Sequence, residues 1–195
     1  MVDKNEVVSF FDALAPTWDA DMVISDLIVG TILDKAGVHK GSRVLDVACG
    51  TGVLVPYYLN RNVSSVTGID ISPAMIEIAR SKYPASPVDF ICADAEIWKS
   101  GNQYDNIVIY NAFPHFSDPE RLFANLSSML SPGGILTIAH GMSREKINSH
   151  HSGSAMRVSN GLPSADDMAV MLGEYLEVTE IISDSNMYQV CGVRK

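Results

Sequence analysis

The most informative segment of the sequence is Val44-Leu45-Asp46-Val47-Ala48-Cys49-Gly50-Thr51-Gly52. Its first part is apolar, as in a buried strand, and Gly50 and Gly52 indicate a tight turn that leads into a helix. Open α/β sheets bind nucleotides and nucleosides at strand–loop–helix junctions of this kind. We therefore predict that Ala48, Gly50 and Gly52 belong to a cofactor-binding loop.

Runs rich in Val and Ile recur on both sides of this loop. They cover residues 43–47, 65–69, 88–92, 105–110 and 134–139. Segments with helical periodicity separate them, and one of these begins at Ser72-Pro73, where a serine N-cap precedes a proline at the first helical position. This alternation of strands and helices predicts a parallel sheet.

The C-terminal end departs from the alternation. Two strand-like runs, residues 176–182 and 187–193, are separated by the turn-forming residues 183–186, which indicates an antiparallel hairpin. We therefore predict an α/β fold: a Rossmann-like, seven-stranded, mostly parallel sheet with helices on both faces and a C-terminal antiparallel hairpin. A length of 195 residues with 47% hydrophobic composition predicts a single domain, residues 1–195.

The composition argues against several classes of partner. The chain has 14 Lys and Arg residues against 23 Asp and Glu residues, a formal charge of -9, and no basic run, which disfavours nucleic acid and anionic membranes. Its first residues lack the basic region of a signal peptide, and no apolar stretch approaches the roughly 18 residues of a membrane span. The three cysteines lack metal-ligand spacing, so we predict no metal site and expect free thiols in the cytoplasm.

Residues around the glycine loop favour one cofactor over another. A dinucleotide fingerprint needs a third glycine where this chain has Val55. Asp46 stands beside the loop, where its negative charge would oppose a pyrophosphate but attract the ammonium group of a methionine moiety. The charge therefore favours S-adenosylmethionine (SAM) over NAD.

The segment from Val44 to Gly52 resembles the first motif of the class I SAM-dependent methyltransferases, in which glycine is usual at the position of Ala48. The resemblance implies that an acid ends the second strand, and Asp70 stands there, 18 residues after Gly52. Its two carboxylate oxygens can accept hydrogen bonds from both ribose hydroxyls.

The same resemblance implies an adenine-binding segment after the third strand. Asp94 would accept a hydrogen bond from the adenine amino group, and the backbone N–H of Ala95 would donate to the ring. Met75 falls where the family often packs an apolar side chain on the adenine or ribose, although a helical Met is also common core filler. Ile71 and Asn111 complete the expected cofactor contacts.

The N-terminal segment 11–19 resembles the opening of the ubiquinone/menaquinone-biosynthesis type of methyltransferase and its small-molecule relatives. We expect residues 1–20 to form a helical cap and residues 141–164 to form a lid over the acceptor site. Trp18 in the cap and Arg144 in the lid are the predicted substrate contacts. Asn111-Ala112-Phe113-Pro114 departs from the Asn/Asp-Pro-Pro-aromatic motif of nucleic-acid base methyltransferases, so we expect a small-molecule acceptor.

Histidines supply the candidates for catalysis. His115 and His140 follow the fourth and fifth strands, and His151 would share a helix face with His150. A histidine titrates near neutral pH, so each is a candidate general base for an acceptor that carries a proton. The alternatives are a purely structural histidine, a metal, haem or corrinoid site formed by the group, or a cluster that binds an anionic substrate together with Arg144.

The sequence thus predicts transfer of a methyl group from SAM, with S-adenosylhomocysteine (SAH) as product, to a small molecule. Two alternatives remain open: a SAM-binding sensor or partner subunit without catalysis, and an NAD(P)-linked oxidoreductase. The oxidoreductase alternative is disfavoured by Val55 and Asp46 and by the lack of a Tyr-x-x-x-Lys pair.

Overall fold

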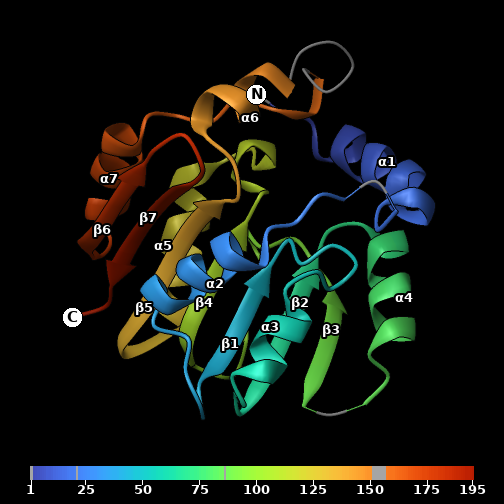
Figure 1. Cartoon of the computed structure of the whole chain (residues 1–195), viewed down its shortest axis with the longest axis horizontal. Helices are drawn as coiled ribbons and strands as arrows, with labels where there is room; N and C mark the ends of the chain where they lie inside the picture. The colour runs from blue at the N-terminus through green and yellow to red at the C-terminus, as the bar shows by residue number, and fades with distance from the viewer. Residues whose placement is uncertain (1, 21, 86, 151–156) are drawn as a thin grey trace.

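A computed structural model describes residues 2–20, 22–85, 87–150 and 157–195, and it contains one seven-stranded sheet (Figure 1). The strands are β1 (Arg43–Val47), β2 (Ser65–Asp70), β3 (Val88–Cys92), β4 (Tyr104–Tyr110), β5 (Leu130–His140), β6 (Glu177–Ser183) and β7 (Tyr188–Val193). Their order across the sheet is β3-β2-β1-β4-β5-β7-β6. The pairs among β1 to β5 are parallel, whereas β7 is antiparallel to both β5 and β6.

This architecture confirms the predicted fold and adds one detail about its end. The C-terminal hairpin does not simply extend the sheet, because β7 inserts between β5 and β6. The register pairs Tyr188 with His140 on one side and with Ser183 on the other. The last strand of the chain is therefore an interior strand, and β6 forms the edge.

Helices cover both faces of the sheet. They are α1 (Lys4–Leu14), η1 (Ala15–Thr17), α2 (Asp26–Lys35), α3 (Val55–Asn60), α4 (Pro73–Lys82), η2 (Phe113–His115), α5 (Pro119–Met129), α6 (Arg144–His150) and α7 (Ala165–Gly173). Side chains of α2, α3 and α4 pack with Val44, Val66 and Val108 on one face. Those of α5 and α7 pack with Leu45 and Ile107 on the other, as the alternation of side chains along a strand requires.

The start of α4 has the predicted local structure. The Ser72 hydroxyl accepts a hydrogen bond from the Met75 N–H at 3.2 Å, and Pro73 occupies the first helical turn. This cap fixes the turn between Asp70 and α4, so the side chain of Asp70 lies at the carboxyl end of the sheet, where the parallel strands end.

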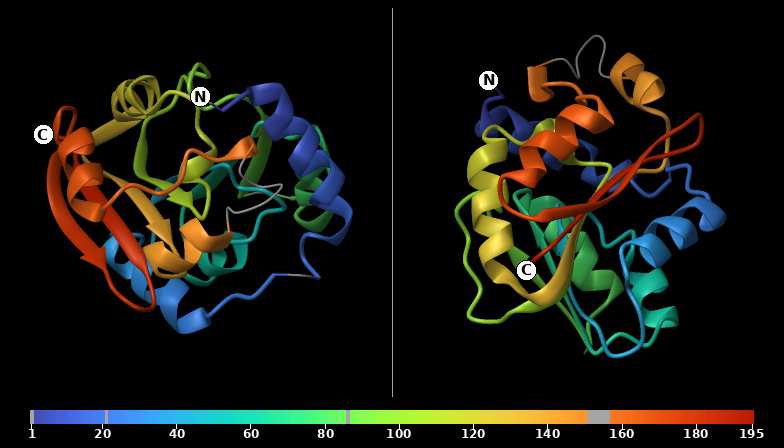
Figure 2. Two further views of the ribbon diagram at one scale, coloured as in Figure 1. Left: turned by 90° about the horizontal axis from the view of Figure 1, so that it is seen from above. Right: turned by 90° about the vertical axis from the view of Figure 1, so that its left-hand side faces the viewer.

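The N-terminal helix and α6 both lie beyond the carboxyl ends of the parallel strands (Figure 1). The two further views agree, with α1 and α6 at the same end of the molecule (Figure 2). Among the described residues, no helix has the length and apolar character needed to cross a membrane. The space between the strand ends and these helices is where the site lies.

Candidate cofactor and acceptor site

The glycine loop after β1 has an unusual backbone. Ala48, Gly50 and Gly52 all have positive φ values, of 54°, 54° and 82°. Glycine adopts this region without cost, whereas an alanine there is strained because its Cβ approaches the carbonyl oxygen. The position at which the family resemblance implied glycine is therefore one where this chain keeps a strained alanine.

A cleft opens between this loop, the ends of β2 to β4 and the N-terminal helix, with about 1130 Å³ of empty space, part of it open to solvent. Most of the predicted site residues line it. They are Trp18, Asp46, Ala48, Gly50, Asp70, Ile71, Met75, Asp94, Ala95, Asn111 and His115. Gly52 is not among the lining residues; a Cβ there would lie 3.0 Å from the Tyr83 ring, so Gly52 serves close packing behind the loop.

Asp46 is a buried carboxyl group at the floor of the cleft, with a residue exposure of 2%. Burial, followed by the nearby charge of Asp70, raises its pKa to about 8. The Tyr58 hydroxyl faces it and opposes this shift, but within the described part of the chain Oδ2 makes no hydrogen bond of normal geometry. Such a group is costly to bury without a partner.

Asp70 is held by backbone N–H groups from two loops, those after β1 and β2. Its Oδ2 accepts from the Gly50 N–H at 2.9 Å, and its Oδ1 accepts from the Ser72 N–H at 2.8 Å. Burial raises its pKa, and these backbone N–H groups oppose that rise. Each carboxylate oxygen keeps a second lone pair, so Asp70 can still accept from two hydroxyl groups.

At the far end of the cleft, Asp94 takes part in a network that the sequence did not predict. Lys4 of α1 donates to Asp94 Oδ2 at 2.6 Å and lies 2.5 Å from Glu96 Oε2. Asp94 Oδ1 accepts from the Glu96 N–H at 2.9 Å. Both Lys4 and Glu96 line the cleft. No sequence signal identifies them, since Lys4 reaches the site from 90 residues away.

Two further carboxylates, both in the N-terminal segment, form hydrogen bonds to residues of the glycine loop and α4. Asp12 accepts from the Ser72 hydroxyl at 2.5 Å and from the Ala74 N–H at 3.1 Å. Asp19 accepts from the Thr51 hydroxyl at 2.5 Å and from Lys82 at 2.7 Å. The N-terminal segment is thus anchored to the glycine loop and to α4.

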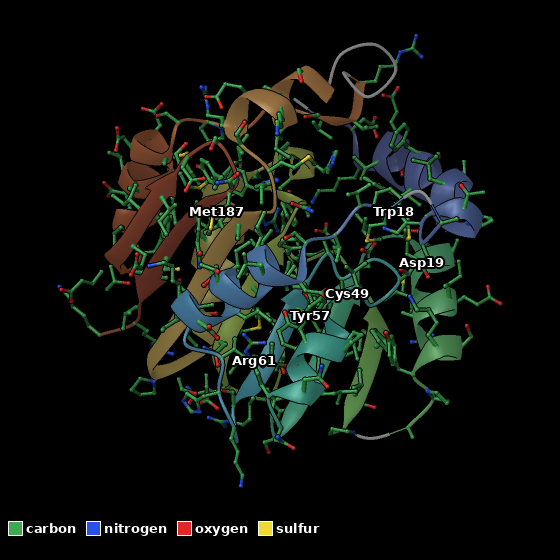
Figure 3. All side chains as sticks on the ribbon, viewed as in Figure 1. Trp18, Asp19, Cys49, Tyr57, Arg61 and Met187 are labelled. Atoms are coloured by element: carbon green, nitrogen blue, oxygen red, sulfur yellow. The ribbon has the colours of Figure 1, made fainter. Side chains whose placement is uncertain are left out.

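Trp18 belongs to the same segment and lies over the glycine loop (Figure 3). Its Nε1 would lie 3.8 Å from a Cβ on Gly50, and its ring contacts the edge of Phe11, with ring centroids 5.7 Å apart. Both rings line the cleft. They form an apolar wall opposite the ends of the strands.

The roof of the cleft, which we define as α1, η2 and residues 157–160, holds His115. The Nδ1 atom of His115 is 2.6 Å from the Val158 carbonyl oxygen, and its ring contacts Phe11 edge-on at 5.0 Å. Asn160 ties the same segment to η2 through the Pro114 carbonyl oxygen at 2.8 Å. His115 is therefore held in a fixed orientation at the cleft.

The other predicted catalytic and substrate residues are placed differently. His140 is 1% exposed and packs edge-on against Tyr188, with centroids 6.0 Å apart, so it lies in the core rather than among the lining residues. Arg144 is also absent from the lining and donates from Nε to the Leu162 carbonyl oxygen at 3.0 Å. His151 lies outside the described residues. Asn111, with φ of 54°, lines the cleft and accepts from the Gly141 N–H at 2.9 Å.

The described residues contain no group of three or more His, Cys, Asp or Glu side chains that could hold a metal ion. The features that remain are the cleft itself, three acids at the ends of β1, β2 and β3, and one oriented histidine. The sheet order and this site together define a Rossmann-like cofactor-binding protein of the methyltransferase class.

Comparison with known proteins agrees with this class. Residues 44–134 match the family model described as a methyltransferase domain. A malonyl-[acyl-carrier protein] O-methyltransferase from Acetivibrio thermocellus is 33% identical over 142 residues, which cover 71% of this chain and 50% of the relative. A ubiquinone biosynthesis O-methyltransferase from Coxiella burnetii is 29% identical over 143 residues, covering 69% of this chain and 61% of the relative.

Solved structures share the fold at low sequence identity. A Haloferax volcanii putative methyltransferase, in complex with the Trm112 methyltransferase activator, has a TM-score of 0.81 at 20% identity, covering 96% of both chains. DhpI, solved as a complex with SAH, has a TM-score of 0.76 at 22% identity, covering 98% of this chain and 97% of the other. Residues 44–134 thus match the methyltransferase-domain family, and the chain has the class I methyltransferase fold, as its sequence motifs predicted. It spans about half to three fifths of the curated relatives that it matches.

Proposed function

We propose that this protein binds SAM in the cleft and transfers its methyl group to a small-molecule acceptor. The observation that carries the proposal is Asp46, a buried carboxyl group whose Oδ2 has no hydrogen bond of normal geometry among the described residues. The ammonium group of the SAM methionine is a cation that would complete this site. A pyrophosphate would instead bring negative charge against Asp46 and Asp70.

The remaining cofactor roles follow from the order of the strand ends. Asp70, pinned by two backbone N–H groups, would accept from the ribose hydroxyls. Asp94 and the Ala95 N–H would bind the adenine edge, while Ile71 and Met75 would pack on its apolar faces. Ala48 and Gly50 allow the ligand to approach the loop closely, and Asn111 holds the ends of β4 and β5 together beside it.

SAM supplies an electrophilic methyl group, and its sulfur is a good leaving group that departs as the thioether of SAH. The chain therefore mainly has to align the acceptor with the methyl group and exclude water. We assign the handling of the acceptor's proton to His115. The Val158 carbonyl only accepts hydrogen bonds, so Nδ1 donates to it, and this contact orients the ring at the cleft. In this assignment the His115 ring would take up the proton of a hydroxyl or amine acceptor.

The acceptor would lie under the roof, against Trp18 and Phe11. In this proposal residues 1–20 act as the cap, and residues 141–164 contribute the lid through their described parts. His140 and Arg144 would act on the acceptor only through the elements that they hold in place, and a role for His151 stays a prediction. The cleft is lined by four carboxyl groups but by only two groups that can carry positive charge, Lys4 and His115. This balance supports a neutral or cationic small-molecule acceptor rather than a polyanion.

We also propose a cytoplasmic location, supported by three cysteines that form no disulfide.

The proposal is tested in two steps. Calorimetric titration of the protein with SAM, SAH and NAD should show binding of SAM and SAH and none of NAD. Metabolite extracts are then incubated with the protein and SAM labelled in its methyl group, and the labelled product is identified by mass spectrometry. Binding of NAD in place of SAM, or SAM binding with no labelled product from any extract, would contradict the proposed reaction.

A further inference from the structure

Lys4 stands between two carboxylates at the end of the cleft assigned to adenine. Its Nζ is 2.6 Å from Asp94 Oδ2 and 2.5 Å from Glu96 Oε2. Burial opposes the charged form of Lys4, but hydrogen bonds and attraction to the two carboxylates raise its pKa above the ordinary value. Lys4 is therefore charged at neutral pH, and its ammonium lies at this end of the cleft.

Glu96 is the fixed member of the network. It is only 3% exposed, and its carboxylate accepts from the N–H groups of Ser117 and Asp118 at 2.7 and 3.1 Å and from the Ser117 hydroxyl. These donors stand just before α5, where the helix N-terminus also favours negative charge. Glu96 holds Lys4, and Lys4 in turn holds Asp94.

Resting on the proposed function, we propose that Lys4 is a positioning residue that fixes the Asp94 carboxylate for the 6-amino group of adenine. Without the ammonium, the carboxylates of Asp94 and Glu96 would face each other across its vacated place and repel. Asp94 would then turn away or take up a proton, and in either case it would lose its alignment as an acceptor. Lys4 thereby makes recognition of adenine depend on the placement of α1.

The arrangement also links the two ends of the cleft. Ser117, which holds Glu96, follows the η2 segment that carries His115. Val7 and Phe11 on α1 line the same cleft and pack in one cluster with Val158 of the roof. One helix, α1, therefore carries both the Lys4 contact at the adenine end and the apolar contacts of the roof.

The test compares SAH with an SAH analogue in which hydrogen replaces the 6-amino group. Calorimetry measures both ligands on the wild type, Lys4→Met, Lys4→Arg and the control Lys35→Met, which removes an exposed ion pair with Glu180 away from the cleft. Loss of the amino group should weaken binding to the wild type by about 10- to 100-fold, the value of a charge-assisted hydrogen bond. In Lys4→Met the two ligands should bind within about threefold of each other, with SAH at least about tenfold weaker than in the wild type.

Lys4→Arg and Lys35→Met should both bind SAH more tightly than the analogue, as the wild type does. If Lys4 had only a structural role, Lys4→Met would weaken both ligands equally and would also keep this preference. If Lys4→Met does not fold, Glu96→Gln, which removes the charge that holds Lys4, should lower the preference instead. If Lys4→Met kept the wild-type preference for SAH over the analogue, or bound SAH more tightly than the wild type, the inference about Lys4 would be wrong. The proposed function would not be affected by that result. Absence of SAH binding to the wild type would overturn the proposed function together with it.

Discussion

The floor and the roof of the cleft are built in different ways. On the floor, Asp46 and Asp70 stand at the carboxyl ends of adjacent strands, and the backbone N–H groups of Gly50, in the loop after β1, and Ser72, two residues on, hold Asp70 in place. The roof is joined by contacts distant in sequence, such as that of His115 with Val158, 43 residues away. A floor of strand ends is set by the topology of the fold, whereas a roof of this kind can change its acceptor without changing the sheet.

The largest difference between the functions of the floor and the roof is expected in the variant His115→Ala. If His115 takes the acceptor's proton, kcat should fall by at least about 100-fold, the usual contribution of a general base. The affinity for SAH, which depends on the floor, should stay within about threefold. Steady-state kinetics with the acceptor found by methyl labelling, together with calorimetry, measures both. A matched His39→Ala variant, on the exposed surface, should leave both values unchanged; an equal loss of SAH affinity and turnover in His115→Ala would break the distinction.

The corresponding change on the floor is Asp46→Asn. Removing the carboxylate should weaken SAM binding by about 30- to 100-fold, because a charge-assisted hydrogen bond is lost. The same change should raise the free energy of unfolding of the ligand-free protein by about 1–2 kcal/mol, since a buried carboxyl group is removed. Calorimetry and urea unfolding measure the two effects. A variant that binds SAM normally would show that Asp46 does not receive the ammonium.

The raised pKa of Asp46 also leads us to expect that stability and SAM affinity depend on pH. Its folded pKa of about 8 lies above the ordinary value of 3.8, so its contribution to stability is fully present below about pH 3.8 and is lost as the pH rises toward 8. Binding of an ammonium requires the charged carboxylate, and binding below pH 8 must therefore release a proton. SAM affinity should rise with pH between 5.5 and 7.5, by up to about tenfold per unit, and this slope should be absent in Asp46→Asn. A flat wild-type profile would contradict the assignment.

The same contrast explains what the sequence could predict. The order of apolar runs, the glycine loop and the acids at the ends of β1, β2 and β3 are local patterns, and parallel strands bring their carboxyl ends to one edge by necessity. Lys4 and Glu96 were not predicted, because their pairing depends on where α1 docks. His140 illustrates a second limit: side chains alternate faces along a strand, so its position depends on how far β5 continues and on the insertion of β7 beside it.

The smallest expected effect concerns the loop itself. Ala48 has φ of 54°, which costs an L-residue roughly 1–2 kcal/mol, and Ala48→Gly removes that strain while it adds about 0.4–1 kcal/mol of unfolded-state entropy. The variant should therefore gain about 0.5 kcal/mol in the free energy of unfolding, with SAH affinity within about twofold. Asn62 has φ of 55° in an exposed turn after α3, and Asn tolerates this conformation. Asn62→Gly should consequently give no gain in urea unfolding, and an equal gain in both variants would mean that the strain at Ala48 is not specific to the floor of the cleft.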